Sequence, residues 1–260
     1  MAFTHIGNIG TALSTSNNQA SLVMTTSAAL EAGNLGVLII AVDNPTGTEG
    51  PSTAVSSVTN SGTAATWTRA VGFTNTNGGA AQDGADISIW YAQPRTTIAS
   101  GATITATFAN ATTSDASAMS CREFTVATGS KIGVSATNTL ANDAAAQGSL
   151  NATTPNAQHL RVRAIASESS STTALTPTST WTIFTQAISG AGTSATEIGI
   201  RGEFLISTDT SAASAPTGGA GAVDHASAYV AFIEVPVFED FDEVTQQPWF
   251  LSAKADTQGY

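Results

Sequence analysis

The chain carries one strand pattern twice, first as Ala32-Gly-Asn-Leu-Gly-Val-Leu-Ile-Ile-Ala41 and again as Ala157-Gln-His-Leu-Arg-Val-Arg-Ala-Ile-Ala166. Shorter matches accompany it in the same order: Ser21–Thr26 with Ser149–Thr154, Thr-Trp-Thr at 66–68 and 180–182, Ile-x-Ile at 87–89 and 198–200, and Ala-Ser-Ala at 116–118 and 226–228. The separation of the matched segments shrinks along the chain, as a duplication with shorter loops in the second copy requires. The pattern predicts one layered β architecture.

Short runs of Val, Ile, Thr and aromatic residues recur between clusters of Gly, Asn, Ser and Pro, and helical periodicity is almost absent. We expect strands near 4–10, 21–26, 35–43, 54–59, 65–73, 86–92, 102–108, 116–126, 131–137, 147–154, 158–167, 180–188, 196–207 and 226–237. Many short strands at this spacing are typical of an all-β, antiparallel β-sandwich of jelly-roll-like form. We expect a β-sandwich domain over 1–236, with similar halves at about 1–137 and 138–236, followed by an extended C-terminal arm over 237–260.

The apolar pattern also predicts which strands are covered. Leu35 to Val42 and Tyr229 to Val235 are apolar on both faces, so we place them centrally. In the segment 198–206, isoleucines and Phe alternate with Arg201 and Glu203, which predicts a solvent-facing side for this strand. We expect the matching Trp67 and Trp181 to be core anchors, because an indole buries more surface than any other side chain.

Composition excludes several functions. Only 10% of residues are charged, the net charge is −11, and the eight Lys and Arg residues are scattered, so no basic stripe is present to follow a nucleic acid. The single cysteine, Cys121, rules out an intrachain disulfide and is expected to be buried. We see no secretion signal at the N-terminus and no apolar run long enough for a membrane helix, so we expect synthesis and folding in a cytoplasm without membrane insertion.

Catalytic motifs are missing from the sequence. His5, His159 and His225 lack metal-ligand spacing and are expected at the surface or at sheet edges. No nucleophile elbow or phosphate-binding loop is present. Asp83 and Asp86 could together ligate calcium, although an Asp-Gly turn explains them equally well. We therefore expect no enzymatic activity, no cofactor and no metal.

Two glutamates offer the remaining route to hydrolysis. Glu123 and Glu234 each lie a few residues after an Ala-Ser-Ala, so they could be a carboxylate pair across a pseudo-twofold axis, as a glycosidase needs. A duplicated strand architecture explains the coincidence as well. A glycan hydrolase is therefore the less favoured hypothesis.

Trp90 is the most suggestive candidate for a surface contact. Ile87, Ile89 and Tyr91 define the apolar face of their strand, so the adjacent Trp90 points to the opposite side. An outward indole could stack on a sugar, fill a subunit interface, or lie under a loop.

The last segment of the chain differs from the rest. It reads Phe238-Glu-Asp-Phe-Asp-Glu-Val-Thr-Gln-Gln-Pro-Trp-Phe-Leu251 and has no copy in the first half. An acidic segment with Phe238, Phe241, Trp249 and Phe250 is typical of an arm that docks its rings on another surface. The alternative is that it folds back across its own sandwich.

The chain resembles β-sandwich structural proteins of tailed bacteriophages in four segments, Gly33–Ala41, Val58–Thr68, Ile87–Ala92 and Thr180–Thr182. The resemblance covers about residues 20–236 and rests on pattern more than on a unique motif. It implies a virion protein that decorates or cements the capsid, or forms a head spike, fibre base or tail accessory. Its expected partners are further copies of itself and other virion proteins, such as the major capsid or tail proteins. The alternative is a carbohydrate-binding module for a host surface glycan, with Trp90 in its site.

Overall fold

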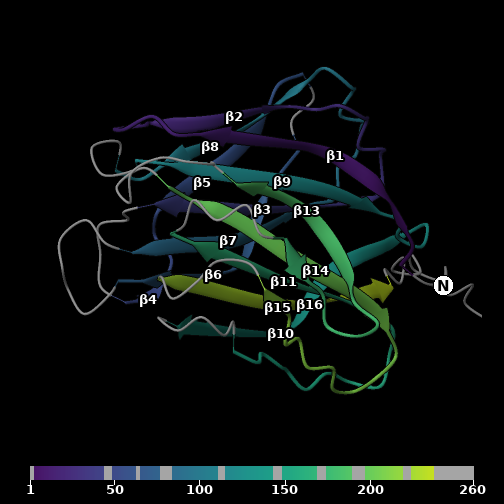
Figure 1. Cartoon of the computed structure of the whole chain (residues 1–260). Coiled ribbons are helices and arrows are strands. Elements are labelled where there is room, and N and C mark those ends of the chain that lie inside the picture. Colours follow the sequence, from purple (N-terminus) through teal and green to yellow (C-terminus); the bar gives the residue numbers. More distant parts are fainter. Residues whose placement is uncertain are drawn as a thin grey trace, which may run out of the picture.

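The computed structural model describes residues 3–43, 49–62, 65–76, 84–110, 115–142, 148–168, 174–188, 197–218 and 224–236, and all regular structure in them is β (Figure 1). Every paired strand has an antiparallel neighbour. The predicted all-β, antiparallel β-sandwich class is confirmed. The jelly-roll form stays a prediction.

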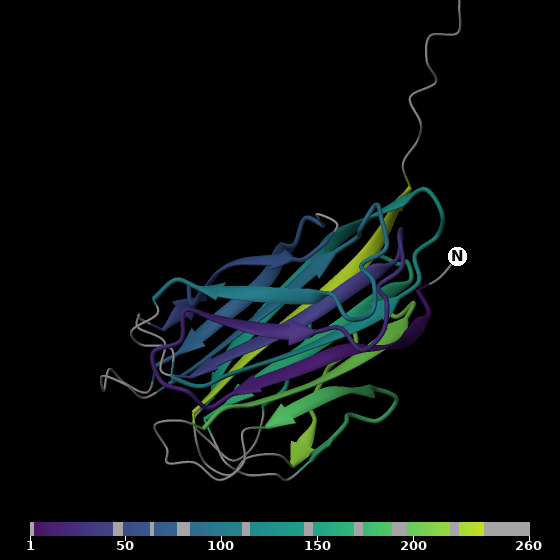
Figure 2. The same ribbon diagram turned by 90° about the horizontal axis from the view of Figure 1, so that it is seen from above.

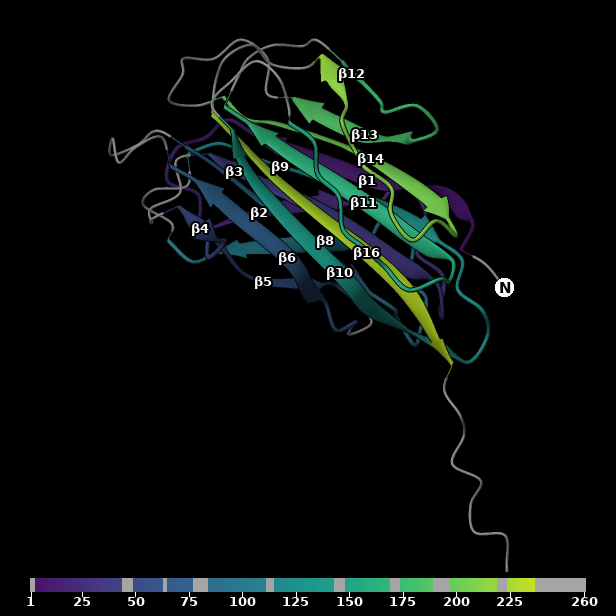
Figure 3. The same cartoon turned by 90° about the horizontal axis from the view of Figure 1, so that it is seen from below.

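Two large sheets form the sandwich, and their strands run in similar directions (Figure 2). The six-stranded sheet has the order β1 (His5–Ser14), β9 (Ser117–Phe124), β3 (Leu35–Asp43), β7 (Ala85–Ala92), β6 (Thr68–Asn75) and β4 (Gly50–Pro51). The five-stranded sheet has the order β10 (Ser130–Asn142), β16 (His225–Pro236), β11 (His159–Ser167), β14 (Gly199–Ser207) and β13 (Thr182–Ile188), seen side by side in Figure 3.

The main core lies between these sheets. Isoleucines, valines and alanines from β3 and β7 meet those from β11, β14 and β16. As predicted, β3 is central and buried on both faces. β16 is also central within its sheet, although its last residues reach solvent.

A third layer covers the outer face of the six-stranded sheet. It is a separate sheet with the order β2 (Ser21–Thr25), β8 (Thr103–Phe108) and β5 (Val55–Asn60). Its apolar residues pack on the outward side chains of β3, β7 and β9 and form a second core that includes Trp67 and the buried Cys121. This layer explains why the central strands are apolar on both faces.

Short segments cover the outer face of the five-stranded sheet. They comprise β12 (Leu175–Thr176) with β15 (Thr217–Gly218) and two isolated bridges, Leu150 to Ser214 and Thr153 to Ser211. Trp181 packs in a small third core beneath them, so both predicted tryptophan anchors are buried. Each predicted strand segment contains a strand except 147–154, whose described part makes only these bridges.

The solvent-facing side predicted for β14 is wrong. Arg201 and Glu203 do alternate with the apolar residues, but both are fully buried. The covering segments lie over this face and take it out of solvent. Arg161 and Arg163 on β11 are buried on the same face, and we call these four side chains the arginine layer.

The two large sheets have corresponding strand orders. When β1-β9-β3-β7-β6 is read against β10-β16-β11-β14-β13, each of these five strands has a counterpart at the same place in the other sheet. The predicted boundary between the halves, at 137/138, falls inside β10, which this correspondence assigns to the second half. The registers agree too, because Leu35 pairs with Phe124 in one sheet and Leu160 with Phe232 in the other. This correspondence supports the two-half organisation, which stays a prediction.

Ring contacts across the core follow the same correspondence. Tyr91 pairs with the first residue of β6 and Phe204 pairs with the first residue of β13, both threonines, so Tyr91 and Phe204 are counterparts. Phe124 and Phe232 are counterparts because they pair with the matching leucines of β3 and β11. The Tyr91 and Phe232 ring centroids are 5.3 Å apart, and those of Phe124 and Phe204 are 5.2 Å apart. Exchanging the halves therefore converts one contact into the other, as a pseudo-twofold axis would.

The registers correct two details of the sequence alignment. Ala41 faces Ile87, and its counterpart Ala166 faces Ile200, so Ile87 matches Ile200 and not Ile198. Ala41 also pairs with Ala118 and Ala166 with Ala226, so Ala118 matches Ala226 and not Ala228. Each slip is two residues long. Because side chains alternate with a period of two, such a slip keeps every residue on its predicted face and is invisible to pattern matching.

Candidate functional site

Trp90 lies on the outer face of β7, as predicted, but it is not available to a partner. The side chain is only 6% exposed and belongs to the second core, under the β2-β8-β5 sheet. Its Nε1 donates a hydrogen bond to Ser88 Oγ at 3.0 Å, and the Arg69 guanidinium lies 5.8 Å from the ring centroid. The proposed role of Trp90 in partner or sugar binding is therefore wrong, because a third layer occupies the space that the sequence left open.

The two glutamates of the hydrolase hypothesis do not form a pair. Alternation along β9 places Glu123 on the outer face of its sheet, with Cys121, whereas alternation along β16 places Glu234 on the inner side, with Phe232. The register also matches Glu123 with Ala231 and not with Glu234. The predicted pseudo-twofold relation between these carboxylates is wrong.

Each of these glutamates instead holds a neighbouring loop. Glu123 Oε1 accepts hydrogen bonds from the backbone N–H of Glu31 at 2.8 Å and from Asn34 Nδ2 at 2.7 Å. Glu234 Oε1 accepts one from the backbone N–H of Ala127 at 2.8 Å. Both contacts anchor the chain where it enters or leaves a strand, which is a structural role.

The histidines differ from their expected positions. His159 and His225 are fully buried, so the surface or edge position predicted for them is wrong. The His225 ring lies 2.8 Å from Ser167 Oγ, and the His159 ring lies 2.7 Å from the Ala157 carbonyl oxygen. These strand-end contacts satisfy a ring nitrogen locally and let the imidazoles enter the interior. His5 is half-buried on the edge strand β1.

Asp86 is a buried carboxylate in β7. Thr74 Oγ1 donates a hydrogen bond to it at 2.6 Å and Ser52 Oγ donates another at 2.9 Å. Its predicted calcium partner, Asp83, lies outside the described residues. Within the described ranges no three His, Cys, Asp or Glu side chains gather as metal ligands. Burial raises the pKa of Asp86 to about 6, against the opposing effect of the two hydroxyl donors and Arg69.

The raised pKa makes Asp86 a source of pH-dependent stability. Between its unfolded pKa of about 3.9 and its folded value, the folded state binds more protons, so stability falls as the pH rises. We expect wild type to lose about 2 kcal/mol relative to Asp86→Asn between pH 4 and pH 7. Urea denaturation of both proteins at the two pH values measures this difference, and the other carboxyl groups cancel. Parallel pH profiles for the two proteins would refute it.

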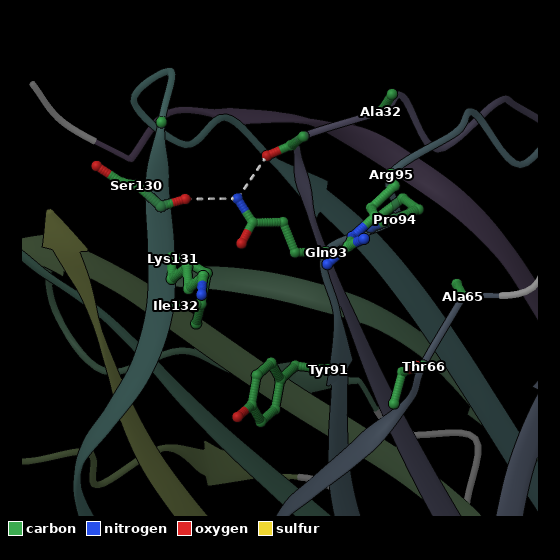
Figure 4. A pocket seen from close by; sticks show the side chains of 12 residues that line it. Ala32, Ala65, Thr66, Tyr91, Gln93, Pro94, Arg95, Ser130, Lys131 and Ile132 are labelled. Carbon is green, nitrogen blue, oxygen red and sulfur yellow. Dashed lines mark hydrogen bonds between the residues drawn. The ribbon is translucent and has the colours of Figure 1, made fainter. Parts of the chain in front are cut away.

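A groove opens at the end of the sandwich where β7 ends and β10 begins (Figure 4). Its volume is about 840 Å³, and it is lined by Ala32, Gly33, Ala65, Thr66, Tyr91, Gln93, Pro94, Arg95, Gly129, Ser130, Lys131 and Ile132. Gln93 Nε2 ties its walls together by donating to the carbonyl oxygens of Gly33 and Ser130, each at 2.9 Å. Figure 4 shows Tyr91 between the strand that bears Ile132 and the segment that bears Thr66, with Lys131 on that strand and Arg95 beside Pro94.

The groove combines features suited to an acidic, partly apolar ligand. The half-buried Tyr91 offers a ring, and the exposed Arg95 and Lys131 offer two cations. No acidic residue is among the lining residues. In a chain with 19 acidic and eight basic residues, this is a local reversal of charge. The groove is the candidate binding site that sequence reasoning missed.

The predicted binding residues Phe238, Phe241, Trp249 and Phe250 lie outside the described residues. The structure does place the point from which they depart. β16 ends at Pro236, which pairs with Ser130 at the start of β10 (Figure 3). Pro236, from which the arm departs, and the groove therefore lie at the same end of the sandwich.

No protein family model, curated protein or solved structure matches the chain. In the part of the chain that the structure describes, no helix is both long and apolar enough to cross a membrane.

Proposed function

We propose that this chain is a non-enzymatic structural protein of a tailed-phage virion, which assembles as a homo-oligomer and decorates or cements the capsid or forms a head-spike or tail accessory component. The observation that carries the proposal is that the described residues up to Pro236 form three hydrophobic cores, whereas the acidic segment that follows carries four aromatic residues and has no copy in the first half. We infer that Phe238, Phe241, Trp249 and Phe250 serve assembly.

The mechanism would be cementing by burial of the arm. Aromatic side chains bury large apolar areas, and each Å² removed from water contributes about 25 cal/mol before the entropic cost of ordering the arm. Acidic residues between the rings keep the free arm soluble and favour a basic acceptor surface. The sandwich supplies a stable body to be displayed or locked in place.

The experiment is incorporation into particles of the phage that encodes the chain. We expect removal of 237–260 to reduce occupancy at least tenfold while leaving the melting temperature of the sandwich unchanged. A full-length variant with Phe238, Phe241, Trp249 and Phe250 all changed to serine keeps the length and the acidic charge and should fail equally. Unchanged occupancy of both variants would refute the arm as the docking element.

A further inference from the structure

We propose that the groove around Tyr91, Arg95 and Lys131 is the docking site for the segment Phe238–Glu243 of a second copy of this chain. The inference rests on the proposed function, because it names the partner surface for the arm. It makes self-assembly an exchange of arms between neighbours.

The arm departs from the sandwich close to the groove. Val235 pairs with Lys131 and Pro236 with Ser130, so the arm departs from β16 beside the part of β10 that lines the groove. When two copies meet at this end, the arm root of each lies near the groove of the other. Such a contact is reciprocal and closes on itself, which gives a dimer and not a filament.

The charges of the groove and of the arm segment are opposite in sign. Two copies that each carry a net charge of −11 repel each other, so a specific contact between them needs a local region of opposite sign. The groove supplies Arg95 and Lys131, and the segment supplies four carboxylates within six residues. Glu31, next to Ala32 in the sequence, accepts a hydrogen bond from Thr97 Oγ1, and Glu234, which pairs with Ile132 across the strands, accepts one from the backbone N–H of Ala127.

The side chains of the arm segment also match those of the groove. In an extended segment, alternate residues point to opposite sides. One side would then carry Phe238 with Asp240 and Asp242, and the other would carry Phe241 with Glu239 and Glu243. Either side presents one ring and two carboxylates, which fits a groove with one ring and two cations.

The length of the arm favours a second copy over the chain's own groove. Residues 237–260 could extend roughly 80 Å at about 3.3 Å per residue, whereas the longest strand of the sandwich, β10, would span only about 43 Å on the same scale. A segment meant only for its own groove, which begins beside Pro236, would need a few residues. The remaining length, which includes Trp249 and Phe250, is suited to reaching across a neighbour.

The test uses full-length proteins and light scattering to measure molar mass. We expect wild type to be a dimer, and both the groove variant Arg95→Ser/Lys131→Ser and the arm variant Phe238→Ser/Phe241→Ser to be monomers with unchanged melting temperatures. An equimolar mixture of the two variants should recover heterodimers, because one partner retains an intact arm and the other an intact groove. The matched control, Lys131→Arg, keeps the charge and should remain a dimer.

Other outcomes overturn the proposal in distinguishable ways. A monomeric wild type would rule out exchange between copies. A mixture of the two variants that stays monomeric would rule it out as well, and a segment bound in its own groove would leave the mixture monomeric. A groove variant that remains a dimer would show that the arm docks elsewhere. The groove variant should also be tested for particle incorporation: if it incorporates normally while removal of 237–260 prevents incorporation, the groove inference fails but the proposed function stands.

Discussion

Replacement of Arg163 by alanine is expected to lower the free energy of unfolding by about 3–5 kcal/mol, because it leaves a buried charge without its counter-ion. Arg163 lies opposite Glu203 in the β11–β14 register and interacts with it electrostatically, and both side chains are fully buried. The guanidinium donates to the carbonyl oxygens of Gly148 at 2.9 Å and Ser214 at 2.8 Å. Its removal therefore also releases the covering segments of the five-stranded sheet. Urea denaturation monitored by tryptophan fluorescence measures the loss.

Two further variants separate the effect of the buried charge on stability from the effect of side-chain size. Arg95→Ala removes the same side chain from an exposed position and should change stability by less than about 0.5 kcal/mol. The double variant Arg163→Met/Glu203→Leu removes both buried charges and should recover much of the loss, since apolar pairs replace buried ion pairs well. A single alanine variant as stable as wild type would contradict the pairing on which this prediction depends.

The arginine layer also shows what the sequence could not reveal. Alternation of Arg201 and Glu203 with isoleucines correctly separates the two faces of β14, yet it cannot say whether solvent or protein lies beyond the polar face. The cover is made of short segments around Leu150 and Ser214, rich in Ser, Thr and Ala and without strand periodicity. Burial of Arg163 and Arg201 lowers the pKa of each to about 10, a cost that becomes visible only with the segments that cover the five-stranded sheet in place.

The burial of the central strand β3 was easier to predict from the sequence than that of the arginine layer. The run from Leu35 to Val42 is apolar at every position except Gly36, so both faces had to be covered whatever the topology. β11 occupies the corresponding place, but its two arginines interrupt the apolar run. Periodicity therefore located the strands and their faces, while the number of layers had to come from the structure.

The groove lay beyond sequence reasoning for a different reason. Arg95 follows the end of β7 and Lys131 lies at the start of β10, and nothing in their spacing brings them together. Only the packing of the two sheets brings both into the lining of one groove with Tyr91. The arm was visible from composition alone, because its acidic and aromatic residues break the Ser- and Thr-rich pattern before it.

Replacement of Trp90 by alanine is expected to cost about 3–5 kcal/mol, as for other large buried aromatic residues. At roughly 2–4 °C per kcal/mol for a chain of this size, the melting temperature should fall by about 6–20 °C. The loss has two sources, since the change opens a cavity between β7 and the β2-β8-β5 sheet and removes the ring beneath the Arg69 guanidinium. Thermal unfolding followed by circular dichroism measures it.

This result would separate the structural role of Trp90 from the sugar-binding hypothesis. A tryptophan that stacks on a glycan from the surface would lose affinity on replacement and leave the melting temperature unchanged. Val23→Ala, at a 50% exposed position of the same covering sheet, is the control and should shift the melting temperature by no more than about 2 °C, since an exposed substitution changes stability by less than about 0.5 kcal/mol. Trp90→Phe should fall between the two, because it keeps a ring but loses the hydrogen bond to Ser88. A Trp90→Ala protein that melts with wild type would show that the third layer does not pack on this strand in solution.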